Sequence, residues 1–145
     1  MRVLKRPMPR GDRLRRGAAA AEMALIVPFL AFILVGTIDF CRLFFTYATI
    51  TNAARNGALW ASDPLAPTQS PYTTVQAAAL ADANQLNPAL TASNVTQTSG
   101  TDGQGNATAI VTVKYKFNMI SSYLGFGSVN ITRQVAMRLE PLVPN

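Results

Sequence analysis

The sequence predicts an α+β protein in which a long N-terminal helix is followed by a small domain with one helix and a three-stranded antiparallel sheet. Three observations lead to this fold class. Residues 18–38 are almost continuously apolar, and residues 40–58 keep a helical periodicity without any helix breaker. The last third of the chain changes to the alternating pattern of half-buried strands.

The positive charge of the chain is concentrated at its N-terminus. Residues 1–16 contain seven basic residues and one acidic residue, whereas the rest of the chain contains six of each. A nucleic-acid-binding protein is expected to carry a basic patch on a folded face, with aromatic side chains that stack on bases. The body has no such patch, so we expect no nucleic-acid partner. A basic leader beside an apolar run is typical of the cytoplasmic flank of a membrane segment, and a disordered tail is the alternative.

The apolar run is long enough to cross a lipid bilayer. It has 21 residues, with Glu22 as its only charge, and about 20 apolar residues span the hydrocarbon core as a helix. A secretory signal peptide would have a shorter apolar core and a small-residue cleavage site after it, which residues 39–42 do not offer. Pro28 should bend the helix in mid-span. We therefore expect a single-pass protein with a cytoplasmic N-terminus and an extracytoplasmic body.

Glu22 needs an explanation, because an ionised carboxylate in hydrocarbon is costly and a simple anchor has no use for it. The position makes sense if a peptidase cuts after Gly17, so that residues 1–17 are removed as a leader. Ala18 then carries a free amino group four residues before Glu22. Glu22 would pair with the Ala18 amine of a neighbouring subunit and fix the register between helices. Alternatively, its side chain would simply snorkel to the cytoplasmic face.

The helix is expected to continue beyond the membrane as a stalk to residue 61, because the first breakers are Asp63, Pro64 and Pro67. Asp39 and Arg42 lie one turn apart and can form an ion pair. The larger or apolar residues of the stalk form one stripe, which should pack on the C-terminal domain or on other subunits. The stripe consists of Phe40, Leu43, Phe44, Tyr47, Thr51, Ala54 and Ala58.

Residues 62–71 are predicted to be a linker, and residues 72–145 an extracytoplasmic α+β domain. Its helix should start at Pro71 or Tyr72, with Ser70 as the N-terminal cap, and run to Leu86. Strands are predicted over residues 95–98, 108–117 and 129–139, with a hairpin loop over residues 99–106.

The sequence offers little chemistry. There is no histidine, which removes the commonest general base and metal ligand. The single cysteine, Cys41, is either an apolar filler or a crosslink between subunits. The segment 102–106 is interpreted as a turn rather than a calcium loop, because no bidentate acid follows it. We expect no enzymatic activity, no cofactor and no metal site.

Four segments of the chain, residues 17–22, 23–28, 38–42 and 51–58, together resemble the TadE-like pseudopilins of the tight-adherence (Tad/Flp) pilus system. Their sequences are Gly-Ala-Ala-Ala-Ala-Glu, Met-Ala-Leu-Ile-Val-Pro, Ile-Asp-Phe-Cys-Arg and Thr-Asn-Ala-Ala-Arg-Asn-Gly-Ala. The resemblance covers about residues 14–60. Cys41 stands where a glycine is more usual, and Asn56 stands where an acid is common.

The resemblance implies a pilin-like fold and a pseudopilin, or minor pilin, of the bacterial inner membrane that takes part in adhesion or secretion. A prepilin peptidase would process it between Gly17 and Ala18. Other pilin or pseudopilin subunits and an inner-membrane pilus assembly platform would be its partners. Within the helix, Pro28, Asp39, Arg42 and Arg55 are expected to be packing positions. The alternative function is a membrane-tethered extracytoplasmic binding module that is unrelated to a filament.

Overall fold

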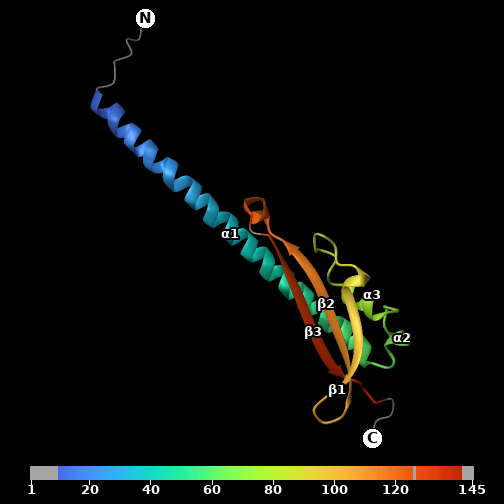
Figure 1. Ribbon diagram of the computed structural model, residues 1–145. Helices are drawn as coiled ribbons and strands as arrows, with labels where there is room; N and C mark the ends of the chain where they lie inside the picture. The colour runs from blue at the N-terminus through green and yellow to red at the C-terminus, as the bar shows by residue number, and fades with distance from the viewer. Residues whose placement is uncertain (1–9, 126, 142–145) are drawn as a thin grey trace, which may run out of the picture. The chain divides into compact units, whose positions relative to one another are not determined.

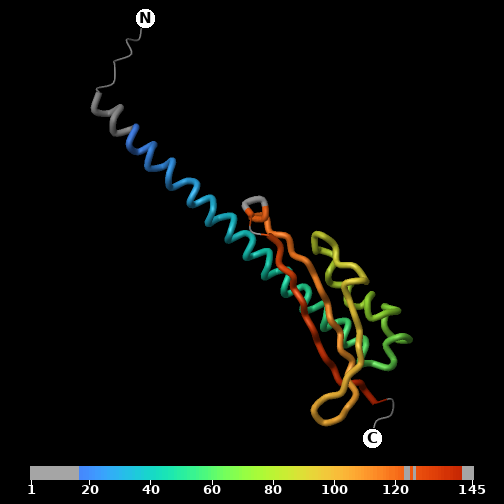
Figure 2. Tube along the Cα trace, viewed as in Figure 1, coloured from blue at the N-terminus to red at the C-terminus, as the bar shows by residue number. Residues whose placement is uncertain are grey.

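A helix of 53 residues, α1 (Arg10–Ser62), begins the part of the chain that is described in this computed structural model (Figures 1 and 2). The structure describes residues 10–125 and 127–141. Most of the predicted leader, residues 1–9, therefore lies outside the described residues. The chain divides into two units, Met1–Ile38 and Asp39–Asn145, and α1 contributes to both.

In the first unit, the described side chains of residues 17–38 are exposed, except for the half-buried Val35. By length and composition, α1 is apolar enough to cross a membrane. Pro28 lies inside the helix and does not end it. The helix begins at Arg10, earlier than the predicted start at Ala18. Arginine and leucine, which make up five of the eight intervening residues, are strong helix formers.

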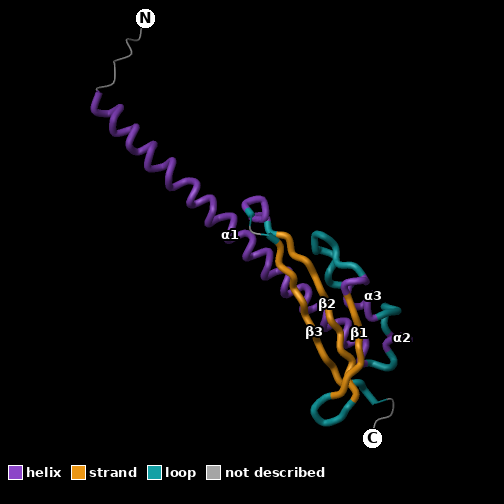
Figure 3. Tube along the Cα trace, viewed as in Figure 1, coloured by secondary structure: helices purple, strands orange, loops and turns teal. Residues whose placement is uncertain are grey.

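The second unit has two layers, in agreement with the predicted α+β class (Figure 3). Its sheet contains β1 (Val95–Thr101), β2 (Ala107–Asn118) and β3 (Ser128–Arg138) in the order β1-β2-β3, and both pairs of neighbours are antiparallel. One face of the sheet packs on the C-terminal half of α1 and on α3 (Val75–Leu80). The short helices of this unit are α2 (Ala66–Gln69), η1 (Ala92–Asn94) and η2 (Ile120–Leu124).

The predicted alternation of β2 and β3 is confirmed. Along β2, Val111, Val113 and Tyr115 are buried, whereas Lys114 and Lys116 are exposed on the other face of the sheet. Along β3 the side chains also alternate, with Ile131 buried toward α1. β1 and β2 are longer than predicted, because backbone pairing continues through residues such as Ser99 and Gly100, which were expected in the hairpin loop. β3 has the predicted length but begins and ends one residue earlier.

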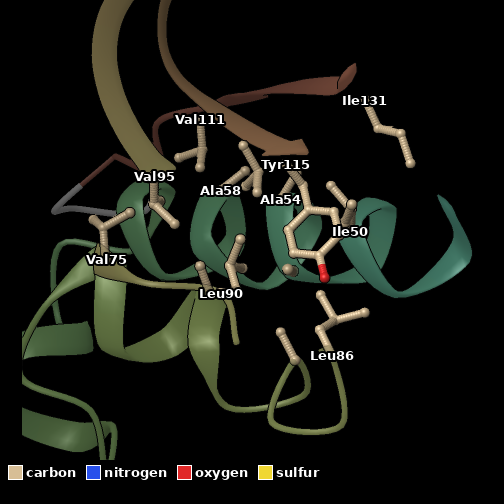
Figure 4. Packing of buried hydrophobic residues seen from close by; sticks show 14 of the residues in the cluster. Ile50, Ala54, Ala58, Val75, Leu86, Leu90, Val95, Val111, Tyr115 and Ile131 are labelled. Atoms are coloured by element: carbon tan, nitrogen blue, oxygen red, sulfur yellow. The ribbon is translucent and has the colours of Figure 1, made fainter. Parts of the chain in front are cut away.

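The core depends on small residues of α1. Ala53, Ala54 and Ala58 are fully buried, so the sheet and α3 approach the helix closely. Figure 4 shows this packing, in which Ile50 of α1 and Tyr115 of β2 are among the large side chains. The Tyr115 hydroxyl donates a hydrogen bond of 2.7 Å to the carbonyl of Pro88, which satisfies the polar end of a buried ring.

Only part of the predicted packing stripe of α1 packs on the domain of the same chain. Phe40, Phe44 and Tyr47 are exposed, and the sheet instead covers a neighbouring face that carries Thr46 and Ile50. The reason is steric: only a face of small and β-branched side chains lets the sheet lie close to the helix axis. The later members of the predicted stripe, Ala54 and Ala58, are buried as expected.

The second predicted helix is shorter than expected. It begins at Val75 rather than at Pro71 or Tyr72, because the Thr74 hydroxyl caps it and accepts a hydrogen bond from the Ala77 amide. The predicted cap, Ser70, serves a turn by accepting a hydrogen bond from the Tyr72 amide. After Leu80 the chain forms single turns instead of continuing to Leu86.

The β1–β2 hairpin is closed by one carboxylate, and its residues 102–106 form a turn, as predicted. Asp102 forms an ion pair of 2.8 Å with Arg138 and accepts hydrogen bonds from the amides of Gln104 and Asn106. The guanidinium of Arg138, together with the donors of Asn106, holds the pKa of Asp102 well below its ordinary value. The Asp102 carboxylate is therefore ionised at neutral pH and keeps its ion pair with Arg138.

Gly57 lies where α1 packs closely against β2 and α3, so Gly57→Ala should destabilise the second unit. A Cβ at this position would lie 3.1 Å from the Val111 side chain and 3.2 Å from that of Ala79. Overpacking a core costs about 1–3 kcal/mol, whereas the better helix propensity of alanine returns about 1 kcal/mol. We expect a lower urea midpoint, measured on the full chain in detergent through the fluorescence of its single tryptophan, Trp60.

Gly103→Ala is the matched control. A Cβ at Gly103 would meet nothing within 4 Å, and its φ is not positive, so the midpoint should stay unchanged or rise slightly. Equal midpoints for the two variants would contradict the close packing at Gly57.

Candidate assembly site

The predicted processing position lies on an exposed part of α1. Gly17 and Ala18 are helical and exposed. A Cβ built on Gly17 would meet no atom within 4 Å. The fold of the chain therefore does not require a glycine at this position, in contrast to Gly57. A requirement for a small residue at 17 has to come from outside the folded chain.

Glu22 follows Ala18 at a spacing of four residues, which places both on the same face of the helix. Its side chain is exposed, and within the described residues it takes part in no ion pair. The carboxylate thus remains available to a group outside this chain or to solvent.

Asp39 is the first residue of the second unit and, among the residues whose burial is described, its one buried charged side chain. Its two carboxylate oxygens accept hydrogen bonds of 2.8 Å from the backbone amides of Ile120 and Ser121. These two amides begin η2, the connection between β2 and β3. The contact ties residues that are more than 80 positions apart in the sequence, and it fixes the end of the sheet against the start of the stalk.

Arg42 completes this cluster. Its guanidinium donates to Asp39 at 3.3 Å, as the spacing of one turn allows, and lies 5.2 Å from the centroid of the Phe117 ring. Arg42 is partly exposed, so the ion pair contributes less than the amide bonds to the buried carboxylate. We refer to Asp39, Arg42, Ile120 and Ser121 as the Asp39 cluster.

The spacing of Asp39 and Arg42 predicted their ion pair, which is present, but not the contact of Asp39 with the amides of η2. No motif marks residues 120 and 121, since backbone donors have no sequence signature. The role of Arg133 of β3 was not predicted either: its guanidinium lies 4.6 Å from the Tyr47 ring centroid and donates to the Thr51 hydroxyl. Both contacts join α1 to the sheet.

The other predicted site residues are exposed positions or lie within the helix. Pro28 is an interior residue of α1, and Arg55 is exposed on it. Cys41 is a free and exposed thiol beside a hollow that Leu86 and Phe117 also line. Their roles toward other subunits remain predictions. Over the described residues, no three His, Cys, Asp or Glu side chains lie together in a way that could hold a metal ion.

Taken together, the apolar helix fits a single-pass membrane anchor, and the body behind it is a small α+β domain. The family model of TadE-like proteins matches residues 17–59, so the chain carries a TadE-like segment and the resemblance is confirmed. Neither the curated proteins nor the solved structures contain a match to this chain. The family indicates a membrane protein associated with Tad pilus systems, whose TadE-like components are structural.

Removing the negative charge of Asp39 should loosen the second unit. In Asp39→Asn, a single amide oxygen faces two backbone donors, and the amide NH₂ opposes one of them. Losing a hydrogen bond to a charged group costs about 1.5–3 kcal/mol, so the urea midpoint of the full chain in detergent should fall. Asp82→Asn is the control, because Asp82 is exposed and accepts its hydrogen bond from the side chain of Asn56 rather than from buried backbone amides.

An Asp39→Asn midpoint equal to that of the control would show that the cluster contributes nothing to stability. Trp60 again reports the transition, since its ring nitrogen donates to the Tyr72 carbonyl inside the same unit.

Proposed function

We propose that this protein is a pseudopilin or minor pilin that a prepilin peptidase cuts between Gly17 and Ala18. The mature chain stays in the bacterial inner membrane as a single-pass protein, with its N-terminus in the cytoplasm and residues 72–145 outside. It assembles there with other pilin or pseudopilin subunits on a pilus assembly platform. The membrane part of the proposal is supported by the apolar helix, and the pilus part by the TadE-like match.

One observation carries the processing step. The TadE-like match begins at residue 17, and the structure gives that glycine no packing role of its own. Glycine inside a helix costs about 1 kcal/mol relative to alanine, and Gly17 stands directly before four alanines and five residues before Glu22. A peptidase that accepts only a small residue before the cut would account for a glycine at this position.

The role proposed for Glu22 follows from charge. After the cut, Ala18 carries a cation and Glu22 an anion one turn further along the helix. Between two subunits, Glu22 of one chain meets the Ala18 amine of the next. In apolar surroundings a mismatch leaves both charges without partners, so the pair sets the axial register. Among the described residues the exposed Glu22 carboxylate forms no ion pair, which is compatible with this role.

Processing is tested by the mass of the membrane-extracted protein. We expect a chain that starts at Ala18, and we expect Gly17→Leu to accumulate the uncut form. Gly36→Leu is the control, because a Cβ at Gly36 also meets nothing within 4 Å but lies away from the cut. A mature chain that still begins with Met1, or equal processing of Gly17→Leu and Gly36→Leu, would contradict the proposal.

The Glu22 pair is tested by comparing Glu22→Ala with Glu22→Asp. The alanine variant should insert in the membrane normally, since the apolar run becomes more hydrophobic. It should lose association with partner subunits by about 3–5 kcal/mol if the pair is fully desolvated, and by less near the interface. Crosslinking through Cys41 measures this association, and the aspartate variant should keep part of it. Undiminished crosslinking and pilus function in Glu22→Ala would favour the snorkelling role instead.

A further inference from the structure

The second unit carries exposed apolar side chains at the end where it follows the membrane-spanning run. On α1, Phe40 and Phe44 are each 61% exposed and Phe45 is 53% exposed, and Tyr47 is also exposed. On η2, Ile120 is 44% exposed. The Asp39 cluster places these two sets at one level, because the amide of Ile120 is bonded to the residue that precedes Phe40.

The position of these side chains along α1 is informative. Phe40 comes two residues after the apolar run, and Phe40 and Tyr47 are about 10 Å apart at 1.5 Å per residue. The polar interface of a bilayer adds about 5–8 Å on each side of its hydrocarbon core. Beyond Tyr47, the next large apolar side chain exposed on the helix is Leu59. Phe40, Phe44 and Phe45 thus span about 7.5 Å of helix, close to the thickness of an interface, and Tyr47 lies about 3 Å beyond Phe45.

Their distribution around α1 distinguishes a lipid surface from a partner helix. Phe40, Phe44 and Phe45 spread over about 140° at 100° per residue, whereas a packed helix would need one narrow stripe that continues along the axis. Here the stripe does not continue, because Ala48, Asn52 and Arg55 occupy the following exposed positions. The exposed aromatic side chains thus form a broad and short band around α1. Fluid lipid can surround such a band, whereas a rigid partner helix could not contact all of it.

The charges of the second unit differ between its two ends, with basic residues near the Asp39 cluster and exposed acidic residues toward the opposite end. Near the Asp39 cluster the exposed charges are basic, namely Arg42 and Lys116, and Asp39 itself is buried. The other acidic residues lie toward the opposite end. Asp63, Asp82 and Glu140 line one hollow together with Ser62, the last residue of α1, and Asp102 is in the hairpin beside Arg138. This polarity is complementary to anionic phospholipid headgroups, which attract nearby basic residues.

We propose that the Asp39 end of the second unit, comprising Phe40, Phe44, Phe45, Tyr47 and Ile120, is seated in the headgroup region of a phospholipid bilayer. The aromatic rings occupy the interface, and Arg42 and Lys116 lie among lipid phosphates. The domain is therefore held on the membrane surface by a second contact besides its anchor. This proposal relies on the membrane anchor of the proposed function, but not on pilus assembly.

The test uses the native cysteine, which is the only one in the chain. The full chain is reconstituted in vesicles of phosphatidylethanolamine and phosphatidylglycerol at a large lipid excess. A nitroxide is attached to Cys41, or to Ile120→Cys or Leu139→Cys in a Cys41→Ser background. Leu139 is the matched control, being 40% exposed and apolar but adjacent to Glu140 at the opposite end. Power-saturation EPR then compares oxygen with a water-soluble nickel chelate as the relaxing agent.

We expect labels at 41 and 120 to be shielded from nickel several-fold more than the label at 139, and to be more accessible to oxygen. Nickel accessibility at 120 equal to that at 139 would overturn the proposal, because the domain base would then be in water. Shielding at 120 that disappears on further lipid dilution, together with loss of spin–spin broadening, would also overturn it and would identify another subunit as the occupant.

Two controls keep the outcomes separate. Trp60 fluorescence has to show that Ile120→Cys folds like the wild type, which is expected for an exposed position. Carbonate washing measures the anchor by itself. Release of the protein by carbonate would contradict the membrane anchor, whereas an anchored protein with a nickel-accessible residue 120 would contradict only the seating of the domain.

Discussion

The hydrogen bonds that the Asp39 carboxylate accepts from the first two amides of η2 are the interaction on which the second unit depends. This interaction joins the first residue of that unit to the connection between its two longest strands, β2 and β3. Hydrogen bonds from two backbone amides to a buried carboxylate are strong and directional, so they set where the sheet ends along α1. At the other end, the Glu140 amide donates to the Ser62 carbonyl, and the sheet lies alongside the helix between these two contacts.

Close packing between these ends follows from the residues of α1. The buried face offers alanines and Gly57, and the valines of β2 fill the space that such small side chains leave. The larger residues Phe40 and Phe44 cannot take part in this packing and remain on the outer face, where their rings contact each other with centroids 5.0 Å apart. The same steric selection thus builds the core and leaves the aromatic surface that we assign to the membrane interface.

The sequence was sufficient for the class of fold, because hydrophobic periodicity distinguishes an apolar helix from alternating strands. It was not sufficient for the packed face of α1, since Phe40 and Tyr47 dominate the pattern by size, whereas packing selects small residues such as Ala54. It predicted an interaction of Asp39 with Arg42 but not with residue 120, because local spacing reveals contacts within a helix and not those across the fold. Glu22 stood out as a charge inside an apolar run, Gly17 as a small residue between the basic leader and that run, and the TadE-like match covers both.

The most direct measurement of the Asp39 contact is hydrogen exchange at the Ile120 and Ser121 amides in the full chain in detergent. These amides are at the start of a short helix and have no earlier turn to bond, so their protection has to come from the carboxylate. We expect slow exchange at both amides in the wild type and fast exchange in Asp39→Asn, while the central β2 amides such as those of Val111 and Val113 remain protected. Fast exchange at residues 120 and 121 in the wild type, or unchanged protection in the variant, would contradict this account.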